Sequence, residues 1–188
     1  LFTLIYLGYV TQNDSSKEYA VTRRSSRLGR WLNHEERLIA SAAPTMDFLV
    51  SETAETINLA VLDRGEVYYL DKRDSPHPFR HCVEIGGCAP AHATALGKVL
   101  LAYLPEHELS VHFDRSRLLP RLTPSTISSW DRLDKELRNI RESGVAFDHE
   151  ELFIGLKCIA APLLVRGDAV AGLSVSMPTT RIDEAHFG

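Results

Sequence analysis

Pro90–Ala102 reads PAHATALGKVLLA, which puts a proline and a polar His/Thr pair directly ahead of a short apolar helix. About sixty residues later, Glu150–Pro162 reads EELFIGLKCIAAP and places a lone cysteine, Cys158, on a strand-like run. Neither block identifies a reaction by itself. In this order and spacing the pair indicates two walls of a binding pocket rather than an active site.

The Gly97-Lys98 dipeptide invites comparison with a nucleotide-binding loop. Such a loop needs a glycine five residues before Gly97 and a serine or threonine after the lysine. Those positions hold His92 and Val99. A phosphate-binding loop is therefore excluded.

Size and composition fit a globular chain. The 188 residues are 44% hydrophobic and 24% charged, enough for one domain with an appendage or for two small domains. No apolar run approaches the roughly eighteen residues that a membrane helix needs. The chain starts at Leu1, so a missing leader proves little. Three cysteines are an odd number, which favours reduced thiols and a cytoplasmic location.

Charge is distributed unevenly along the chain. The net charge is −4, yet the segment Lys17–Arg30 holds five basic residues against one acid. This asymmetry predicts a small basic module joined to an acidic body. A solvated face with a chance excess of arginine remains the alternative.

The first thirty residues are typical of a helix end, a hairpin and a basic helix. Leu1–Leu7 suits a helix that ends at Gly8, although its composition also suits a strand. Tyr9–Thr11 and Glu18–Thr22 predict two short strands around an Asn-Asp-Ser turn. Arg23–Arg30 would follow as a basic helix, which gives the back half of a winged helix-turn-helix.

The remaining residues predict an α+β domain, an antiparallel sheet with helices on its faces. Asn33 would cap a long helix over Asn33–Glu52, with Pro44 dividing or kinking it. Strands are expected at Thr56–Leu62, Val67–Asp71, Cys82–Ile85, Val145–Asp148, Leu156–Val165 and Ala169–Met177. Helices are expected at His92–Tyr103, Glu106–His112 and Ile127–Ser143, and a truncated one at Arg181–Gly188.

Several separated blocks resemble the effector-binding domain of the IclR family of bacterial transcription regulators. They are PAHATALGKVLLA, GVAFDHEE, GLKCIAAPLL and GLSVSMPTTRI, and the LGYV…YAVT…LG run before them resembles the wing of the family's winged-helix domain. The resemblance implies a GAF-like domain at 55–188 that binds a small organic acid. A linker helix at 31–54 would join it to the end of a DNA-binding domain at 1–30. It also implies operator DNA as a partner and a homodimer or homotetramer, with no membrane partner.

The predicted effector site combines the helix start with three strands. A helix N-terminus offers unpaired amides that suit a carboxylate, and the resemblance places the positions of Ala95 and Leu96 in the family's pocket. The resemblance also puts an acidic pocket residue at Asp148, where a solvated loop acid is the alternative. The predicted effector-binding residues are Thr94, Ala95, Leu96, Gly97, Asp148, Cys158, Ser174 and Ser176.

The pairing of the last two strands decides whether the polar groups meet. Ser174 and Ser176 share one face, because strand residues alternate. An odd-length loop centred on Gly167 would set Cys158 opposite Ser176, whereas a two-residue loop would break the cluster. A buried Cys158 acting as a small hydrophobe is the alternative.

Other chemistries fit the sequence poorly. The gap between Cys82 and Cys88 exceeds the usual spacing of structural zinc ligands, and no nucleophile elbow surrounds either serine. The sequence therefore predicts no metal, no cofactor and no enzyme. Phosphate contacts to DNA are expected from Lys17, Arg23 and Arg24. A stand-alone GAF-like binding or dimerisation module without DNA binding remains the alternative function.

Overall fold

The computed structural model describes residues 1–13, 16–22, 24–105, 107–109 and 113–182, with the backbone alone for residues 26–34. The chain divides into two compact units, Leu1–Ala42 and Ala43–Gly188. Each unit is described by itself.

The first unit contains a short helix and a hairpin. Its elements are α1 (Phe2–Tyr6), β1 (Val10–Gln12), β2 (Tyr19–Val21) and the beginning of α2 (Ser26–Thr53). Of the two possibilities for Leu1–Leu7, the helix is the one that forms, and Gly8 follows it with φ +73°. β1 and β2 pair antiparallel, with Val10 opposite Val21 and Gln12 opposite Tyr19, which confirms the predicted hairpin.

Helix α2 is continuous from Ser26 to Thr53. The predicted boundary at Asn33 is therefore wrong, and Pro44 does not divide the helix, whereas the alternative of a kink at Pro44 stays a prediction. The eighteen residues of α2 before Pro44 include no proline, so each of them keeps its backbone amide as a donor. Pro44 removes a single amide, which a helix of this length tolerates.

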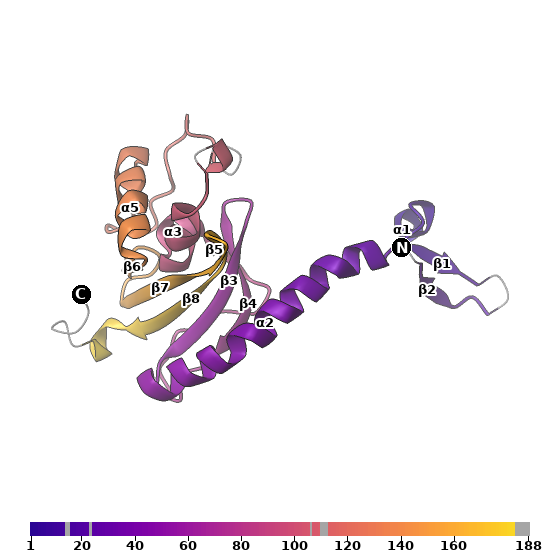
Figure 1. Cartoon of the computed structure of the whole chain (residues 1–188), viewed down its shortest axis with the longest axis horizontal. Helices are drawn as coiled ribbons and strands as arrows, with labels where there is room; N and C mark the ends of the chain where they lie inside the picture. Colours follow the sequence, from indigo (N-terminus) through magenta and orange to yellow (C-terminus); the bar gives the residue numbers. More distant parts are fainter. Residues whose placement is uncertain (14–15, 23, 106, 110–112, 183–188) are drawn as a thin grey trace. The chain divides into compact units, whose positions relative to one another are not determined.

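The second unit is built on a six-stranded antiparallel sheet of order β5-β4-β3-β8-β7-β6 (Figure 1). This confirms the α+β prediction. The strands are β3 (Thr56–Asp63), β4 (Glu66–Arg73), β5 (Cys88–Pro90), β6 (Ala146–His149), β7 (Leu156–Val165) and β8 (Asp168–Pro178).

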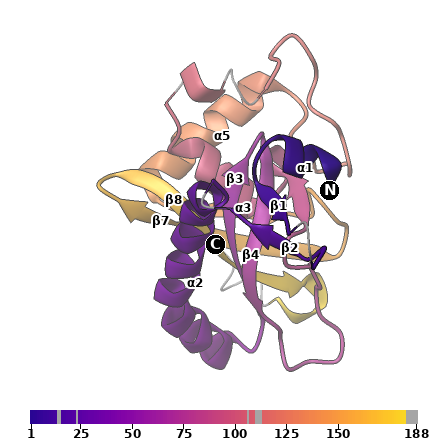
Figure 2. The ribbon, with the colours of Figure 1, turned by 90° about the vertical axis from the view of Figure 1, so that its right-hand side faces the viewer.

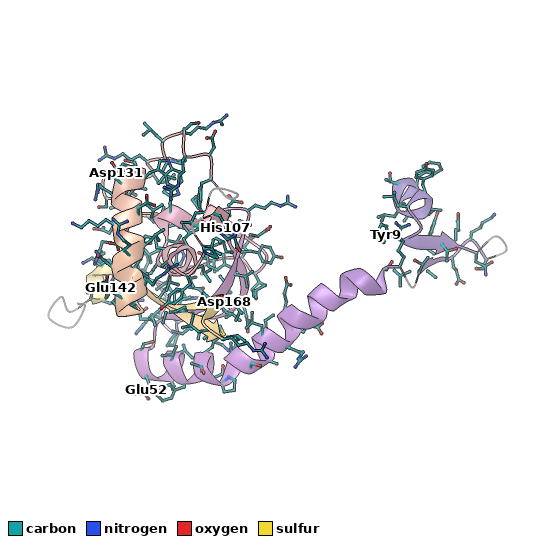
Figure 3. All side chains as sticks on the ribbon, turned by 45° about the horizontal axis from the view of Figure 1, so that its top comes forward. Tyr9, Glu52, His107, Asp131, Glu142 and Asp168 are labelled. Atoms are coloured by element: carbon teal, nitrogen blue, oxygen red, sulfur yellow. The ribbon has the colours of Figure 1, made fainter. Side chains whose placement is uncertain are left out.

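Helices cover both faces of this sheet. The 3₁₀ turn η1 (Ala91–Ala93), α3 (Ala95–Ala102) and α5 (Trp130–Ser143) lie over one face, and α3 packs against β3, β6, β7 and β8. The last turns of α2 lie on the opposite side of the sheet (Figures 1 and 2). Asp131 and Glu142 project outward from the two ends of α5, away from the core (Figure 3).

The β7–β8 hairpin reaches the predicted pairing by an unexpected route. Its turn is Arg166-Gly167, two residues with φ of +56° and +96°, as in the mirror-image turns that suit tight hairpins. Of the two loop lengths considered, the two-residue loop is the one that forms, and the expectation that it would break the cluster is wrong. Leu163 pairs with Ala171, but Leu164 pairs with Ala169, so a bulge at Val170 shifts the register by one residue. Cys158 therefore still faces Ser176.

Two predicted elements differ in the structure. Cys82–Ile85 is not a strand, and β5 follows Gly86-Gly87 instead of preceding it. The Gly86 amide donates to the Tyr69 carbonyl (2.8 Å), and the Tyr69 amide donates to the Gly87 carbonyl (3.1 Å). The glycine pair is therefore bonded to β4 directly before the edge strand β5 begins. The helix expected at His92–Tyr103 is broken at Thr94, which is extended.

Three other predictions concern the helices around the loops. The long helix starts at Trp130 instead of Ile127. Of the helix expected at Glu106–His112, the structure describes residues 107–109, which are helical. Residues 106 and 110–112 lie outside the described residues. At the C-terminal end Thr179–Arg181 forms a 3₁₀ turn, and 183–188 lie outside the description.

Candidate functional site

A buried pocket lies between the start of α3 and the sheet. Seven of the eight predicted site residues line it, namely Thr94, Ala95, Leu96, Asp148, Cys158, Ser174 and Ser176. The sequence did not single out the other lining residues, Tyr69, His81, Leu152 and Leu156. The space open to a water-sized molecule is about 10 Å³, room for about one water.

Strand register brings the polar side chains together. Asp148 pairs with Cys158, and Cys158 pairs with Ser176, so three neighbouring strands contribute to one row across the sheet. The next row pairs Ala160 with Ser174 and Ser174 with Asn58. Ser174 and Ser176 are thus neighbours on the face that α3 covers.

Thr94 organises the helix start. Its Oγ1 accepts a hydrogen bond from the Gly97 amide (2.9 Å), and its carbonyl accepts from the Lys98 amide (2.9 Å). The amides of Ala95 and Leu96 precede this first intrahelical bond and lie at the positive end of the helix. This end of α3 can therefore offer two backbone donors to an anion.

Gly97 was predicted to contact a ligand, but it is not a lining residue of the pocket. A Cβ built at this position would lie 2.1 Å from the Ala91 carbonyl oxygen and 2.2 Å from the Ala91 Cα. Gly97 therefore lets the backbone of η1 pack against α3.

The polar groups of the pocket form a hydrogen-bonded cluster. The Cys158 thiol donates to Ser176 Oγ (3.2 Å), and Asn58 Nδ2 donates to Ser176 Oγ (3.1 Å) and to Ser174 Oγ (3.4 Å). Burial raises the pKa of the Cys158 thiol, and the nearby Asp148 adds to this shift. Cys158 therefore remains a neutral thiol, which is the wrong state for a nucleophile.

Lys98 is buried and held by acids outside the pocket. Its Nζ is paired with Glu151 Oε1, and Glu136 Oε1 lies 3.8 Å away. The Glu151 amide in turn donates to Asp148 Oδ1 (2.7 Å). The ion pair therefore anchors the turn that presents Asp148, and Lys98 has a structural role.

Asp148 is a buried carboxyl of the pocket, and its pKa is raised. Burial raises its pKa from 3.8 to about 7; the Glu151 amide bond and Lys98 oppose the shift, and the Glu151 charge adds to it. The carboxyl is therefore divided between neutral and charged forms near pH 7. It can donate a hydrogen bond in one form and accept in the other.

The raised pKa of Asp148 predicts a pH-dependent stability. Folded protein binds this proton more tightly than the unfolded chain, so its stabilising effect is complete below pH 4 and is lost as pH rises through about 7. We expect Asp148→Asn to remove this contribution. The free energy of unfolding of the wild type should fall relative to the variant by up to about 1.4 kcal/mol per pH unit between pH 4 and 7.

Urea unfolding of both proteins from pH 4 to pH 8 measures this difference. The Asn side chain can still accept from the Glu151 amide, so the local turn is retained. Parallel stability curves for the two proteins would contradict a titrating Asp148.

A larger outer cavity adjoins the pocket and shares Tyr69, His81 and Leu152 with it. The space open to a water-sized molecule there is about 300 Å³. Phe153 also lines it, with its ring 6.0 Å from that of His81. An apolar body could therefore lie outside while a polar head reaches the inner pocket.

No cluster of three or more metal-ligating side chains occurs among the described residues. Cys82 and Cys88 are exposed, whereas Cys158 is buried.

A family model for the C-terminal domain of the bacterial transcriptional regulator IclR matches residues 32–188. The chain belongs to the IclR family. This is a family of transcriptional regulators and not of enzymes. The pocket described above is therefore in the effector domain of an IclR-type regulator.

Curated IclR-family relatives align over nearly the whole chain. The KdgR regulator of Dickeya chrysanthemi is 39% identical over 98% of this chain, and that of Escherichia coli K12 is 39% identical over 98%. The chain spans 60% of the length of the first relative and 70% of the second. The E. coli repressor IclR is 32% identical over 98% of the chain and 68% of its own length.

Solved IclR-family structures have the same fold. The C-terminal domain of E. coli KdgR matches with a TM-score of 0.70 at 39% identity, covering 80% of this chain and 87% of that one. An IclR homologue from Microbacterium hydrocarbonoxydans, complexed with 4-hydroxybenzoate, matches with a TM-score of 0.74 at 25% identity, covering 98% and 75%. The PobR inducer-binding domain from Acinetobacter, a double mutant complexed with 3-hydroxybenzoic acid, gives 0.69 at 29%, covering 79% and 87%.

The predicted DNA contacts of this IclR-family chain lie in the first unit. Lys17 is exposed at the hairpin end. Arg24 donates from Nη1 to the Leu7 carbonyl (2.7 Å) and lies 5.2 Å from the Tyr9 ring centroid, so part of its hydrogen-bonding capacity is used within the unit. Arg23 lies outside the described residues.

The helices of the described residues lack the combination of length and hydropathy that defines a membrane span. None is both long and apolar enough to cross a bilayer.

Proposed function

We propose that the inner pocket binds the head group of a small organic acid and that this binding controls DNA binding by the complete regulator. The observation that carries the proposal is the convergence of helix-start amides and two buried serines on one enclosed site. Amides at a helix start and serine hydroxyls are groups that stabilise a carboxylate. Two relatives of similar fold are complexes with hydroxybenzoates, which supports an acid as ligand here.

The volume of the pocket bears on how such a ligand would bind. The inner space of about 10 Å³ accommodates one water, so a head group requires displacement of the lining. Leu152 lines both cavities and lies in the turn Glu150–Gly155, between β6 and β7. Movement of this turn would admit the head group and leave the ligand body in the outer cavity.

Regulation requires that the ligand favour one arrangement of the protein over another. In our proposal the regulator is a homodimer or homotetramer, and α2 links the effector domain to the DNA-binding domain. Lys17, Arg23 and Arg24 would contribute phosphate contacts near the hairpin. An effector that favours one spacing of the DNA-binding domains would change operator affinity.

The alternative is a GAF-like module that binds a ligand or dimerises without binding DNA. The relatives' greater length favours the regulator, because residues beyond those of this chain would carry the rest of the DNA-binding domain. An operator-binding assay on the protein encoded by the complete gene separates the two functions.

Thermal unfolding with a panel of small acids tests the ligand class. A ligand at 100 times its dissociation constant stabilises the folded state by about 2.7 kcal/mol. For a chain of this size we expect at least one of 3-hydroxybenzoate, 4-hydroxybenzoate and pyruvate to raise the midpoint by about 5–10 °C. The double variant Ser174→Ala/Ser176→Ala should lose most of that shift.

Ser143→Ala is the matched control, because Ser143 is exposed at the end of α5. It should keep the full shift. An acid that stabilises the serine double variant as strongly as the wild type would place its binding elsewhere and contradict the proposal.

A further inference from the structure

Asn58 is a buried polar residue behind the pocket serines. It lies on β3 in the run TINLAVLD, with 2% of its surface exposed. Its backbone pairs with Ser174 on β8, and its side chain lies on the same face as the two serines. A polar side chain at such a position is expensive to bury unless it has partners.

The hydrogen-bond partners of Ser176 restrict the direction of its proton. Ser176 Oγ accepts from Asn58 Nδ2 (3.1 Å) and from the Cys158 thiol (3.2 Å). A serine hydroxyl has two acceptor sites and one proton. Because both acceptor sites are occupied, the hydroxyl can take part in a further bond only as a donor.

Ser174 also accepts a hydrogen bond from Asn58, at a longer distance than Ser176 does. Its Oγ accepts from Asn58 Nδ2 at 3.4 Å. Ser174 and Ser176 both line the inner pocket, where the amides of Ala95 and Leu96 are also donors. The hydroxyls and amides therefore offer donors to whatever enters, and the carboxyl of Asp148 is the lining group that can also accept.

We propose that Asn58 is a positioning residue that makes Ser174 and Ser176 hydrogen-bond donors toward the ligand, and thereby selects a carboxylate over the matching carboxamide. A carboxylate only accepts hydrogen bonds, whereas the NH₂ group of a carboxamide placed against the two serines and the helix-start amides would meet donors and remain unpaired. The inference rests on the proposed function, because it concerns the same ligand in the same pocket.

The orientation of the Asn58 amide decides the donor direction of the two serines. Asn58 Oδ1 is buried without a hydrogen-bond partner among the described residues. The opposite orientation of the amide would put the oxygen beside the serines, which would then donate to Asn58 and not to a ligand. The donor direction of the two serine hydroxyls therefore depends on one side chain that lies behind the lining.

Titration calorimetry with acid and amide pairs tests the inference. The probes are 3-hydroxybenzoate, 4-hydroxybenzoate and pyruvate, each with its carboxamide. We expect the wild-type chain to bind at least one acid about 5-fold or more tightly than its amide, since about 5-fold is the smallest factor that an unpaired buried donor costs. Asn58→Leu, which removes the donor at similar volume, should reduce this acid-to-amide ratio about 5- to 10-fold.

Thr56→Val is the matched control. Thr56 is buried on the same strand, but its hydroxyl donates to the His81 carbonyl (3.2 Å) and accepts from the Ser75 amide (3.3 Å). The ratio should be unchanged in this variant. Near-UV circular dichroism checks the packing of each protein, and Asn58→Ala replaces Asn58→Leu if the leucine variant is not native.

The outcomes distinguish a failure of the inference about Asn58 from a failure of the proposed function. A ratio that falls only in the Asn58 variants supports the inference. Equal losses of acid and amide affinity in those variants, or a similar fall in Thr56→Val, would show a structural role and overturn it while leaving the proposed function intact. A wild-type chain that binds none of the three acids overturns the proposed function itself.

Discussion

Replacing Lys98 with methionine is expected to destabilise the effector domain by about 3–5 kcal/mol, because it leaves the buried Glu151 carboxylate without its cation. The Lys98 side chain is 1% exposed and that of Glu151 is 5% exposed. Glu151 Oε2 already has no hydrogen-bond partner among the described residues. Urea unfolding at pH 7 measures the loss.

Two further variants serve as controls for Lys98→Met. Lys72→Met breaks a partly exposed pair with Asp74 (3.0 Å) and should cost less than about 1 kcal/mol. The double variant Lys98→Met/Glu151→Leu should recover most of the lost stability, because it replaces both charges with apolar groups. A double variant as unstable as Lys98→Met would show that the charge pair is not the cause.

Gly97→Ala is expected to destabilise the domain by about 3 kcal/mol or more, at the upper end of what overpacking costs. The new methyl group would lie 2.1 Å from the Ala91 carbonyl oxygen, and both partners are backbone held in a turn and a helix. Relief requires α3 to move away from η1. Chemical unfolding measures the stability, and the same movement should weaken acid binding through the Ala95 and Leu96 amides.

Gly172→Ala is the control for overpacking against α3. Its added Cβ would lie 2.9 Å from Leu96 Cδ2, the end of a side chain that can rotate away. This variant should lose about 1–2 kcal/mol less stability than Gly97→Ala. Equal losses in the two variants would contradict the special role of the Ala91 contact.

The sequence predicted the pocket better than it predicted the path of the chain around it. Alternation along β8 correctly put Ser174 and Ser176 on one face, and the resemblance supplied the start of α3. From the sequence, the facing of Cys158 and Ser176 depended on an odd-length loop, which does not form. The bulge at Val170 compensates for the two-residue turn, and no residue type in that run marks its place.

Other misses arise from tertiary context. Asn58 could have been noticed as a polar residue in an otherwise apolar strand, but its bonds to the serines depend on pairing between strands more than a hundred residues apart. Tyr69 enters the pocket from β4 in the same way. A strand was expected at Cys82–Ile85, directly before Gly86-Gly87, whereas the amide and carbonyl bonds of this glycine pair to Tyr69 lead into a strand that follows it.

The position of a bound acid tests the central claim most directly. A crystal structure of the chain grown with the acid that gives the largest thermal shift would locate the carboxylate. The account predicts carboxylate oxygens within about 3 Å of the Ala95 or Leu96 amide and of the Ser174 or Ser176 hydroxyl. An acid bound with its carboxylate outside the inner pocket, and those four donors untouched, would contradict it.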